Sequence, residues 1–167
     1  MDGINTLEGT IGIGHTRWAT HGKPSATNSH PHYDNDNIFA VVHNGIIENY
    51  HELRKFLEEN NYTFFSDTDT EVIPNLLDLY AEEDFFKTIQ KVIKMLRGSY
   101  ALGIMNTKYP ETIFCARKDS PLIIGKGKDE NFIASDVPAL LKYTNQVYYL
   151  ENGEMGIITK DAVEIFD

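Results

Sequence analysis

The densest set of chemically active side chains in the sequence is the octet His15-Thr16-Arg17-Trp18-Ala19-Thr20-His21-Gly22. Within it, the guanidinium of Arg17 presents a planar fork of donors that suits a carboxylate or a phosphate. A salt bridge to one of the many acidic residues is an equally good interpretation of this arginine by itself. The apolar run before the octet, residues 10–14, predicts a short buried strand, which would place the octet near a strand end.

A second candidate is the pair Asn44-Gly45, which follows the continuous apolar run 38–42. That run predicts a strand buried on both faces. Asn-Gly is a hairpin signal, but helical periodicity follows it, so we predict a strand-to-helix turn. A glycine N–H beside an asparagine amide supplies the two donors that an oxyanion hole requires. A plain turn glycine with a capping asparagine is the more common alternative.

Acidic and hydroxyl side chains alternate in residues 66–71, with the sequence Ser-Asp-Thr-Asp-Thr-Glu. Thr68 and Glu71 match a capping box for a helix that begins near Val72. One of the carboxylates could instead project into a site and hold an ammonium group. The capping role alone would also explain this composition.

The predicted surface loop 22–37 contains His30-Pro31-His32. Two histidines separated by one proline, with no third ligand at a standard spacing, are weak evidence for a metal ion. We therefore predict hydrogen-bonding histidines, and neither a metal nor a cofactor.

Composition limits the function classes. The 167 residues carry a net charge of -10 without a cluster of lysines and arginines, which argues against nucleic acid and anionic membranes as partners. No apolar run approaches the length needed to span a membrane. The single cysteine, Cys115, cannot form an internal disulfide and suits a cytoplasmic setting.

The elements that would position these residues follow from periodicity. Helices are predicted over residues 50–60, 72–79 and 85–96, the last capped by Asp84, with a short helix after Asp136. Strands are predicted over residues 62–65, 100–105, 112–116, 122–125, 131–134, 146–150, 154–159 and 163–166. Strands at hairpin spacing, accompanied by a few helices, indicate an α+β fold of antiparallel sheets. Because no linker divides residues 1–167, we expect one domain.

Five motifs together resemble the glutaminase domain of the glucosamine-6-phosphate synthases, the glutamine–fructose-6-phosphate aminotransferases. They are the octet and residues 28–32, 43–49, 66–71 and 120–125, in the same order as in that family, and the match covers residues 12–167. Other class II glutamine amidotransferases share the Asn-Gly element. The octet with Trp18 and the continuation 46–49 favour the glucosamine-6-phosphate branch.

The resemblance implies an N-terminal nucleophile hydrolase fold, a four-layer αββα sandwich of antiparallel sheets. It also implies a site for L-glutamine and its product L-glutamate. The resemblance implies that Arg17, with Thr20 and His21, binds the α-carboxylate of glutamine and that Asp69 binds its ammonium group. It further implies that Asn44 and Gly45 stabilise the oxyanion, that Trp18 lies where ammonia leaves, and that His30 supports the pocket.

One departure from the family concerns the nucleophile, which is a cysteine at the mature N-terminus. Met1-Asp2-Gly3 contains none, and Cys115 lies within a strand pattern, so we predict that it is a core thiol. We therefore expect a fragment truncated at its N-terminus, without the partner sugar-phosphate isomerase domain and with negligible glutamine hydrolysis. Exposed sheet edges suggest the further hypothesis that it self-associates as a homo-oligomer.

The sequence leaves two alternatives open. One is a non-catalytic module that binds an amino acid or a protein partner. The other is the glutaminase domain of a different class II amidotransferase.

Overall fold

The structure is a computed structural model that describes residues 8–17 and 22–167. Its three helices are α1 Tyr50–Glu59, α2 Val72–Leu79 and α3 Phe85–Met95. Its strands are β1 His32–Tyr33, β2 Phe39–Ile47, β3 Gly98–Asn106, β4 Ile113–Lys118, β5 Ile123–Lys126, β6 Asn131–Ala134, β7 Val147–Tyr149, β8 Met155–Ile158 and β9 Val163–Phe166.

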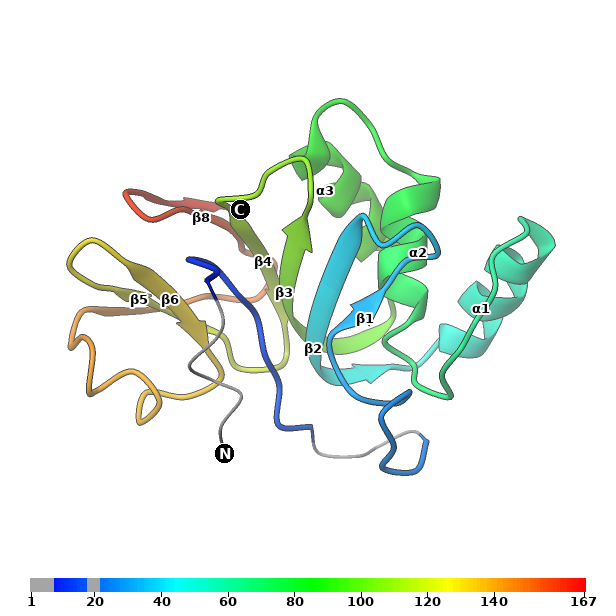
Figure 1. Cartoon of the computed structure of the whole chain (residues 1–167), viewed down its shortest axis with the longest axis horizontal. Coiled ribbons are helices and arrows are strands. Elements are labelled where there is room, and N and C mark those ends of the chain that lie inside the picture. The colour runs from blue at the N-terminus through cyan, green and yellow to red at the C-terminus, as the bar shows by residue number, and fades with distance from the viewer. Residues whose placement is uncertain (1–7, 18–21) are drawn as a thin grey trace.

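The strands form two antiparallel sheets (Figure 1). The larger sheet has six strands in the order β1-β2-β3-β4-β8-β9, and the smaller has three in the order β6-β5-β7. The chain leaves the larger sheet after β4, builds the whole smaller sheet and returns at β8. Short connections join β3 to β4, β5 to β6 and β8 to β9, which are consecutive in sequence and pair directly.

Alternation along β3 divides the core in two. Tyr100, Leu102 and Ile104 pack in a cluster with the three helices. Ala101 packs in the second cluster, which also contains residues of the smaller sheet, and a Cβ on Gly103 would lie 2.8 Å from Ile133 Cδ1 of β6. The six-stranded sheet therefore lies between a helical layer and the smaller sheet, which confirms the α+β sandwich of antiparallel sheets.

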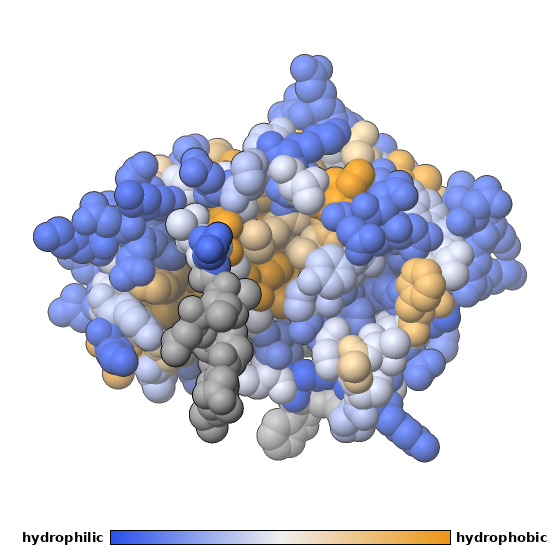
Figure 2. Space-filling model, viewed as in Figure 1, coloured by the Kyte–Doolittle hydropathy of each residue, from blue (hydrophilic) through white to orange (hydrophobic). Residues whose placement is uncertain are grey.

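The face of the molecule drawn in Figure 2 shows where the core reaches the surface. Apolar side chains are visible near its centre, in the region of β3 and β4, and hydrophilic side chains surround them. None of the described helices has the length and apolar character needed to span a membrane.

The predicted helices have the expected local causes. Asp84 caps α3, with its Oδ1 accepting a hydrogen bond from the Phe86 N–H at 3.1 Å. Pro74 lies in the first turn of α2, where its missing N–H costs no intrahelical bond. Leu53 and Leu57 form the buried face of α1.

Two predicted strands are wrong. Residues 10–14 do not form a strand, and Ile11 and Ile13 instead pack against the core between the sheets. Residues 62–65 belong to neither sheet: side chains accept the N–H groups of Thr63 and Phe65, and the carbonyl of Leu57 accepts that of Tyr62. Asn35 bonds both the N–H and the carbonyl of Thr63 at 2.8 Å, in place of a neighbouring strand.

Two predicted helix features are also wrong. The short helix after Asp136 is a series of turns, in which Leu141 N–H donates to Val137 O and Thr144 N–H donates to Leu140 O, without forming a continuous helix. The capping box at Thr68 and Glu71 does not form, because Glu71 precedes α2 directly and its carboxylate bonds residues 65 and 66 instead.

The predicted strand-to-helix turn at Asn44-Gly45 is wrong as well, since both residues lie inside β2. The pairing of β2 with β3 runs without interruption from Phe39 opposite Asn106 to Ile47 opposite Gly98. Nine ladder positions outweigh the turn preference of a local Asn-Gly pair. The turn into α1 therefore lies at residues 48–49.

Candidate functional site

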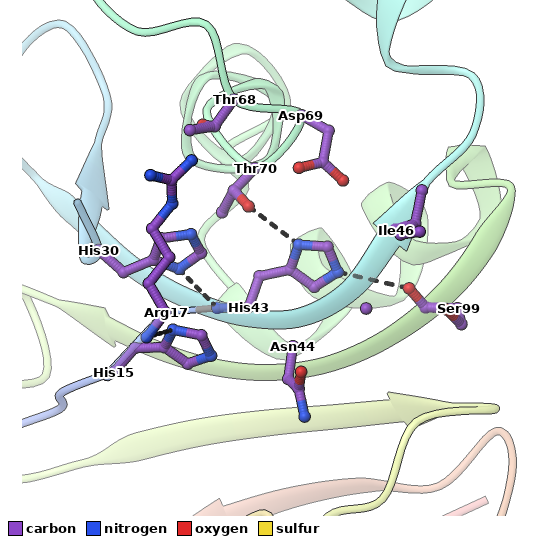
Figure 3. Close-up of a pocket in the computed structure, with 11 residues that line it drawn as sticks. His15, Arg17, His30, His43, Asn44, Ile46, Thr68, Asp69, Thr70 and Ser99 are labelled. Carbon is purple, nitrogen blue, oxygen red and sulfur yellow. Dashed lines mark hydrogen bonds between the residues drawn. The ribbon is translucent and has the colours of Figure 1, made fainter. Parts of the chain in front are cut away.

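A cavity of about 290 Å³ opens where the end of β2 meets three other parts of the chain (Figure 3). Residues 43–46 of β2 form its floor, residues 68–70 approach from the loop before α2, and Ser99 belongs to β3. Residues of the N-terminal part, among them Arg17 and His30, complete the lining. The cavity is therefore built from segments that are distant in sequence.

Five of the predicted site residues line this cavity: Arg17, His30, Asn44, Gly45 and Asp69. A cation, a carboxylate and an asparagine-glycine pair thus meet in one place, as the resemblance implies. The other three predicted residues, Trp18, Thr20 and His21, lie outside the described part of the chain.

The guanidinium of Arg17 is held beside the cavity by main-chain carbonyls. Nη2 donates to Gly22 O at 3.1 Å, and Nη1 donates to Lys23 O at 3.4 Å. The Arg17 N–H donates to His15 Nδ1 at 2.9 Å, while the residue has a φ of 55°. These contacts fix the direction of a charged fork that can receive a carboxylate.

The carboxylate of Asp69 is almost fully buried, with 3% of the residue exposed. Its Oδ2 accepts a hydrogen bond from the Ile47 N–H at 2.7 Å, which joins the loop to the end of β2. A buried carboxylate beside a cavity is a strong partner for an ammonium group, because little water competes for it.

Asn44 and Gly45 lie on β2 between these charged groups and the smaller sheet. A second cavity, of about 100 Å³, lies on the inter-sheet side and shares His15, His43 and Asn44 with the first. Figure 3 shows the Asn44 side chain directed away from the His43 ring. Gly45 has a φ of 131° that an L side chain rarely adopts, so its position needs glycine.

His43 is a cavity residue that the sequence prediction missed. Its ring is buried, with Nδ1 2.9 Å from Thr70 Oγ1 and Nε2 3.4 Å from the carbonyl oxygen of Ser99. Burial lowers the pKa of His43, whereas the nearby Asp69 carboxylate raises it. Its position directly before Asn44 was the available signal.

Three further histidines gather at one side of the cavity. The rings of His15 and His30 stack with centroids 4.7 Å apart, and His32 meets His30 edge-on at 4.9 Å. Burial, followed by the nearby His32, His15, His43 and Arg17, lowers the pKa of His30 to about 3. Because its Nδ1 accepts the His43 N–H at 3.2 Å, His30 is a neutral hydrogen-bonding residue.

No set of three or more His, Cys, Asp or Glu side chains within residues 8–17 and 22–167 has an arrangement that could hold a metal ion. His32 Nε2 lies 3.0 Å from Thr68 Oγ1. His30 and His32 thus have hydrogen-bonding partners, as the sequence predicted for this pair.

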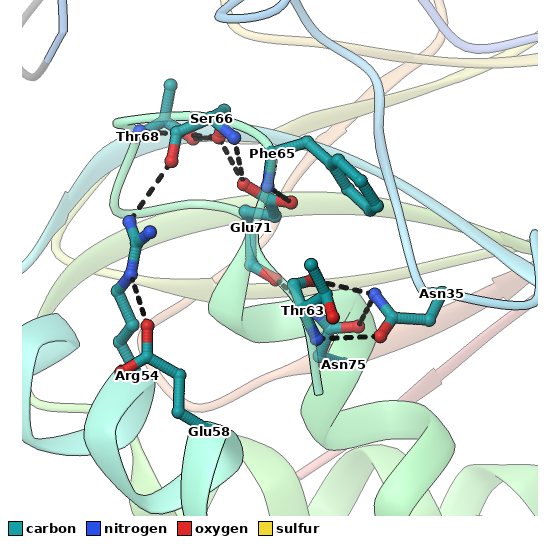
Figure 4. A network of polar contacts seen from close by, with 9 residues as sticks. All are labelled: Asn35, Arg54, Glu58, Thr63, Phe65, Ser66, Thr68, Glu71 and Asn75. Carbon is teal, nitrogen blue, oxygen red and sulfur yellow. Dashed lines mark hydrogen bonds and ion pairs between the residues drawn. The ribbon is translucent and has the colours of Figure 1, made fainter. Parts of the chain in front are cut away.

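A polar network fixes the loop that carries Asp69 (Figure 4). The two carboxylate oxygens of Glu71 accept hydrogen bonds from Phe65 N–H at 2.8 Å and Ser66 N–H at 2.7 Å, and Glu71 also bonds the Ser66 hydroxyl. Arg54 of α1 donates to Ser66 O at 3.0 Å. Buried charge-assisted bonds of this kind make the position of Asp69 well defined.

Cys115 is the core thiol that the sequence predicted. It is fully buried in β4, does not line the cavity, and burial raises its pKa to about 12. A thiol so far from ionisation is a poor nucleophile.

Comparison with known proteins gives related enzymes over nearly the whole chain. It is 58% identical, over 96% of its length, to the glutamine–fructose-6-phosphate aminotransferase (isomerizing) of Caldanaerobacter subterraneus subsp. tengcongensis. It is 52% identical, over 98%, to the protein of the same name from Pyrococcus horikoshii. The chain spans only 26% and 28% of these two relatives.

A solved structure has the same fold. The glutamine phosphoribosylpyrophosphate amidotransferase of B. subtilis superposes on 91% of this chain, and 33% of its own chain, with a TM-score of 0.74 at 29% identity. The family model of the glutamine amidotransferase domain matches residues 15–142, more than half of the sequence. The chain therefore belongs to the glutamine amidotransferase domain family.

Proposed function

We propose that the cavity binds L-glutamine by both of its ends. Arg17 would hold the α-carboxylate and Asp69 the α-ammonium. Asn44 and the Gly45 N–H would stabilise the oxygen of the side-chain amide as it becomes an oxyanion. The main support for this proposal is that a guanidinium, a carboxylate and the Asn-Gly pair all line one cavity of about 290 Å³.

Size and polarity support this ligand class. A volume of this order lies at the lower limit for small-molecule pockets, so it suits one free amino acid better than a peptide or nucleotide. Opposite charges at separate positions suit a zwitterion. By resemblance to the family, we assign Thr20 and His21 to the carboxylate, Trp18 to the path by which ammonia leaves, and His30 to support of the pocket.

The names of the relatives extend the proposal. Since they are glutamine–fructose-6-phosphate aminotransferases, we propose that the glutamine nitrogen is transferred, as ammonia, to fructose 6-phosphate, giving glucosamine 6-phosphate. A sugar-phosphate isomerase domain would be the partner that uses the ammonia, and we place the activity in the cytoplasm. The proposal needs no metal or cofactor.

The chemical step requires a nucleophile. A thiolate that attacks the side-chain carbonyl carbon would form a thioester and release ammonia, once the leaving nitrogen is protonated. The only cysteine of the sequence is the buried Cys115. We therefore expect this chain to bind glutamine without hydrolysing it measurably, which is also what a non-catalytic amino-acid-binding module would do.

Calorimetric titration with glutamine and two shortened analogues tests the binding proposal. 4-Aminobutanamide is glutamine without its α-carboxylate, and glutaramic acid is glutamine without its α-amine. We expect glutamine to bind, and each analogue to bind at least about tenfold more weakly, because each loses a charge-assisted hydrogen bond. Equal affinities, or no heat of binding for glutamine, would overturn the proposal. An ammonia-release assay on the same sample checks the expected lack of hydrolysis.

A further inference from the structure

Two hydrogen bonds join β2 to the loop before α2, and they enclose the Asn-Gly pair. Thr70 Oγ1 lies 2.9 Å from His43 Nδ1, and the Ile47 N–H donates to Asp69 Oδ2 at 2.7 Å. Asp69 and Thr70 are consecutive, whereas His43 and Ile47 are four residues apart on the strand. The residues between these two strand positions are Asn44, Gly45 and Ile46, all of which line the cavity.

The direction of the bonds at His43 follows from its partners. The carbonyl oxygen of Ser99 can only accept, so His43 Nε2, 3.4 Å away, carries the proton. In the neutral ring Nδ1 is then an acceptor and receives the Thr70 hydroxyl. The imidazole therefore donates to Ser99 of β3 through Nε2 and accepts from Thr70 of the loop through Nδ1.

The two bonds restrict the loop more than either could alone. The Asp69–Ile47 bond fixes one point of the loop against β2, in addition to the bonds of Glu71 and Arg54 to residues 65 and 66. The bond from His43 to Thr70 adds a second fixed point one residue away. The three residues that make these bonds with their side chains are buried: Asp69 is 3%, Thr70 1% and His43 3% exposed. Water therefore does not readily replace a lost hydrogen-bonding partner.

The spacing that these bonds fix has a chemical meaning if the cavity binds glutamine. Asp69 would receive the α-ammonium, and Asn44 with Gly45 the side-chain carbonyl oxygen. The distance between these two positions must match the number of methylene groups that separate the ammonium from the amide. Glutamine has one methylene more than asparagine, and both have the same end groups.

We propose that His43 is a positioning residue that, through Thr70, holds Asp69 at the separation from Asn44 and Gly45 that selects glutamine over asparagine. This inference rests on the proposed function. The role of His43 would be to hold the loop, and not to bind the amino acid. Because His43 acts through the loop, its loss should change the preference for glutamine over asparagine as well as the affinity for glutamine.

The test compares the dissociation constants of L-glutamine and L-asparagine for a set of variants, by calorimetry. Thr70→Val removes the hydroxyl but keeps the shape, and Thr70→Ser restores the hydroxyl. His43→Leu removes the imidazole, which is the other partner of the same hydrogen bond. Thr88→Val is the matched control, because Thr88 is a fully buried threonine in α3 whose Oγ1 accepts the Glu82 N–H at 2.9 Å.

We expect Thr70→Val to weaken glutamine binding about three- to tenfold, the range for one lost hydrogen bond, and to lower the preference for glutamine over asparagine by at least about threefold. Thr70→Ser should recover most of this preference. A double variant with His43→Leu should lose little more than either single variant, since both remove the same contact. Thr88→Val should reduce stability and leave the preference unchanged.

The outcomes separate this inference from the proposed function. If the unaltered chain binds no glutamine, the proposed function fails at the first titration, and the inference fails with it. If the unaltered chain prefers glutamine and Thr70→Val keeps that preference, only the inference is overturned. An equal loss of preference in Thr88→Val would likewise show that general destabilisation, and not the His43 contact, is responsible. If His43→Leu does not fold, Thr70→Val with its Thr70→Ser rescue still decides.

Discussion

The carbonyl oxygen of Ser99 in β3 lies in the space that a β-carbon on Gly45 in β2 would need, and the Ser120 hydroxyl lies 2.8 Å from the same position. Gly45 also has a φ of 131°, which strains any L side chain. The floor of the cavity is therefore formed by a strand that can approach its neighbour this closely only without a side chain.

We predict that Gly45→Ala lowers the free energy of unfolding by about 3 kcal/mol or more, from strain and overpacking together. Gly153→Ala is the control, because Gly153 has a φ of 95° and nothing within 4 Å of its β-carbon position. The control should lose only about 1 kcal/mol, the cost of the backbone strain. Urea unfolding of both variants measures the difference, and equal losses would be inconsistent with the close approach of β2 and β3.

Glu71 should stabilise the Asp69 loop more than an exposed glutamate stabilises its surroundings. Glu71→Gln keeps the shape of the side chain but weakens its bonds to residues 65 and 66, at an expected cost of about 1.5–3 kcal/mol. Glu58→Gln is the control, since Glu58 forms a surface ion pair with Arg54 and its side chain is 52% exposed. That change should cost less than about 1 kcal/mol. Chemical denaturation that gave the two variants the same stability would refute the role of Glu71.

The sequence predicted most of the fold because much of the relevant information is local. Asp84 caps α3, and strands separated by turn residues became hairpins. Residues 62–65 were misassigned because an extended apolar pattern does not say whether strands or side chains satisfy the backbone. Asn44-Gly45 was misassigned because the partner that keeps it in a strand is β3, more than 50 residues away along the chain.

The site was predictable where one residue suggests its own chemistry, and less so where the chemistry depends on neighbours. Arg17 and Asp69 carry charges that suit opposite ends of an amino acid, and both line the cavity. His43 was missed because its importance depends on Thr70 and Ser99, which are 27 and 56 residues away in sequence. Only the fold brings these three together.

The low pKa of His30, about 3, predicts a loss of stability in acid. The folded protein keeps this ring neutral, whereas the unfolded chain takes up a proton as the pH falls through about 6.5. The contribution of His30 to the free energy of unfolding is therefore greatest above that pH and is lost between pH 6.5 and 3. The slope from one histidine is at most about 1.4 kcal/mol per pH unit, and less for a partly solvated ring.

His30→Asn tests this, because the asparagine carbonyl can still accept the His43 N–H but does not titrate. We expect a shallower decrease in stability between pH 7.5 and 5, measured by urea unfolding at each pH. An imidazole NMR titration should show His30 unprotonated at pH 5. Identical slopes for the two proteins, or a His30 titration near pH 6.5, would contradict the prediction.

Cys115 should be unreactive in the folded protein. Its burial and its pKa of about 12 leave very little thiolate at pH 8. Ellman's reagent should therefore label it only slowly in buffer and rapidly in denaturing urea. Rapid stoichiometric labelling of the folded protein would show that the thiol is accessible, and would reopen Cys115 as a candidate nucleophile.

Whether Arg17 and Asp69 together bind one amino acid is measured by calorimetric titration of L-glutamine into the unaltered chain, Arg17→Ala and Asp69→Asn. Asp69→Asn removes the negative charge and keeps one oxygen that can accept the Ile47 N–H, although an NH2 group replaces the other oxygen. Arg97→Ala is the control, since this arginine is 63% exposed and pairs with Glu52. Each cavity variant should weaken binding about tenfold to a hundredfold, the cost of one charge-assisted contact, and the control should not change it. Unchanged affinity in Arg17→Ala or Asp69→Asn would contradict the claim that these two side chains hold the two ends of one amino acid.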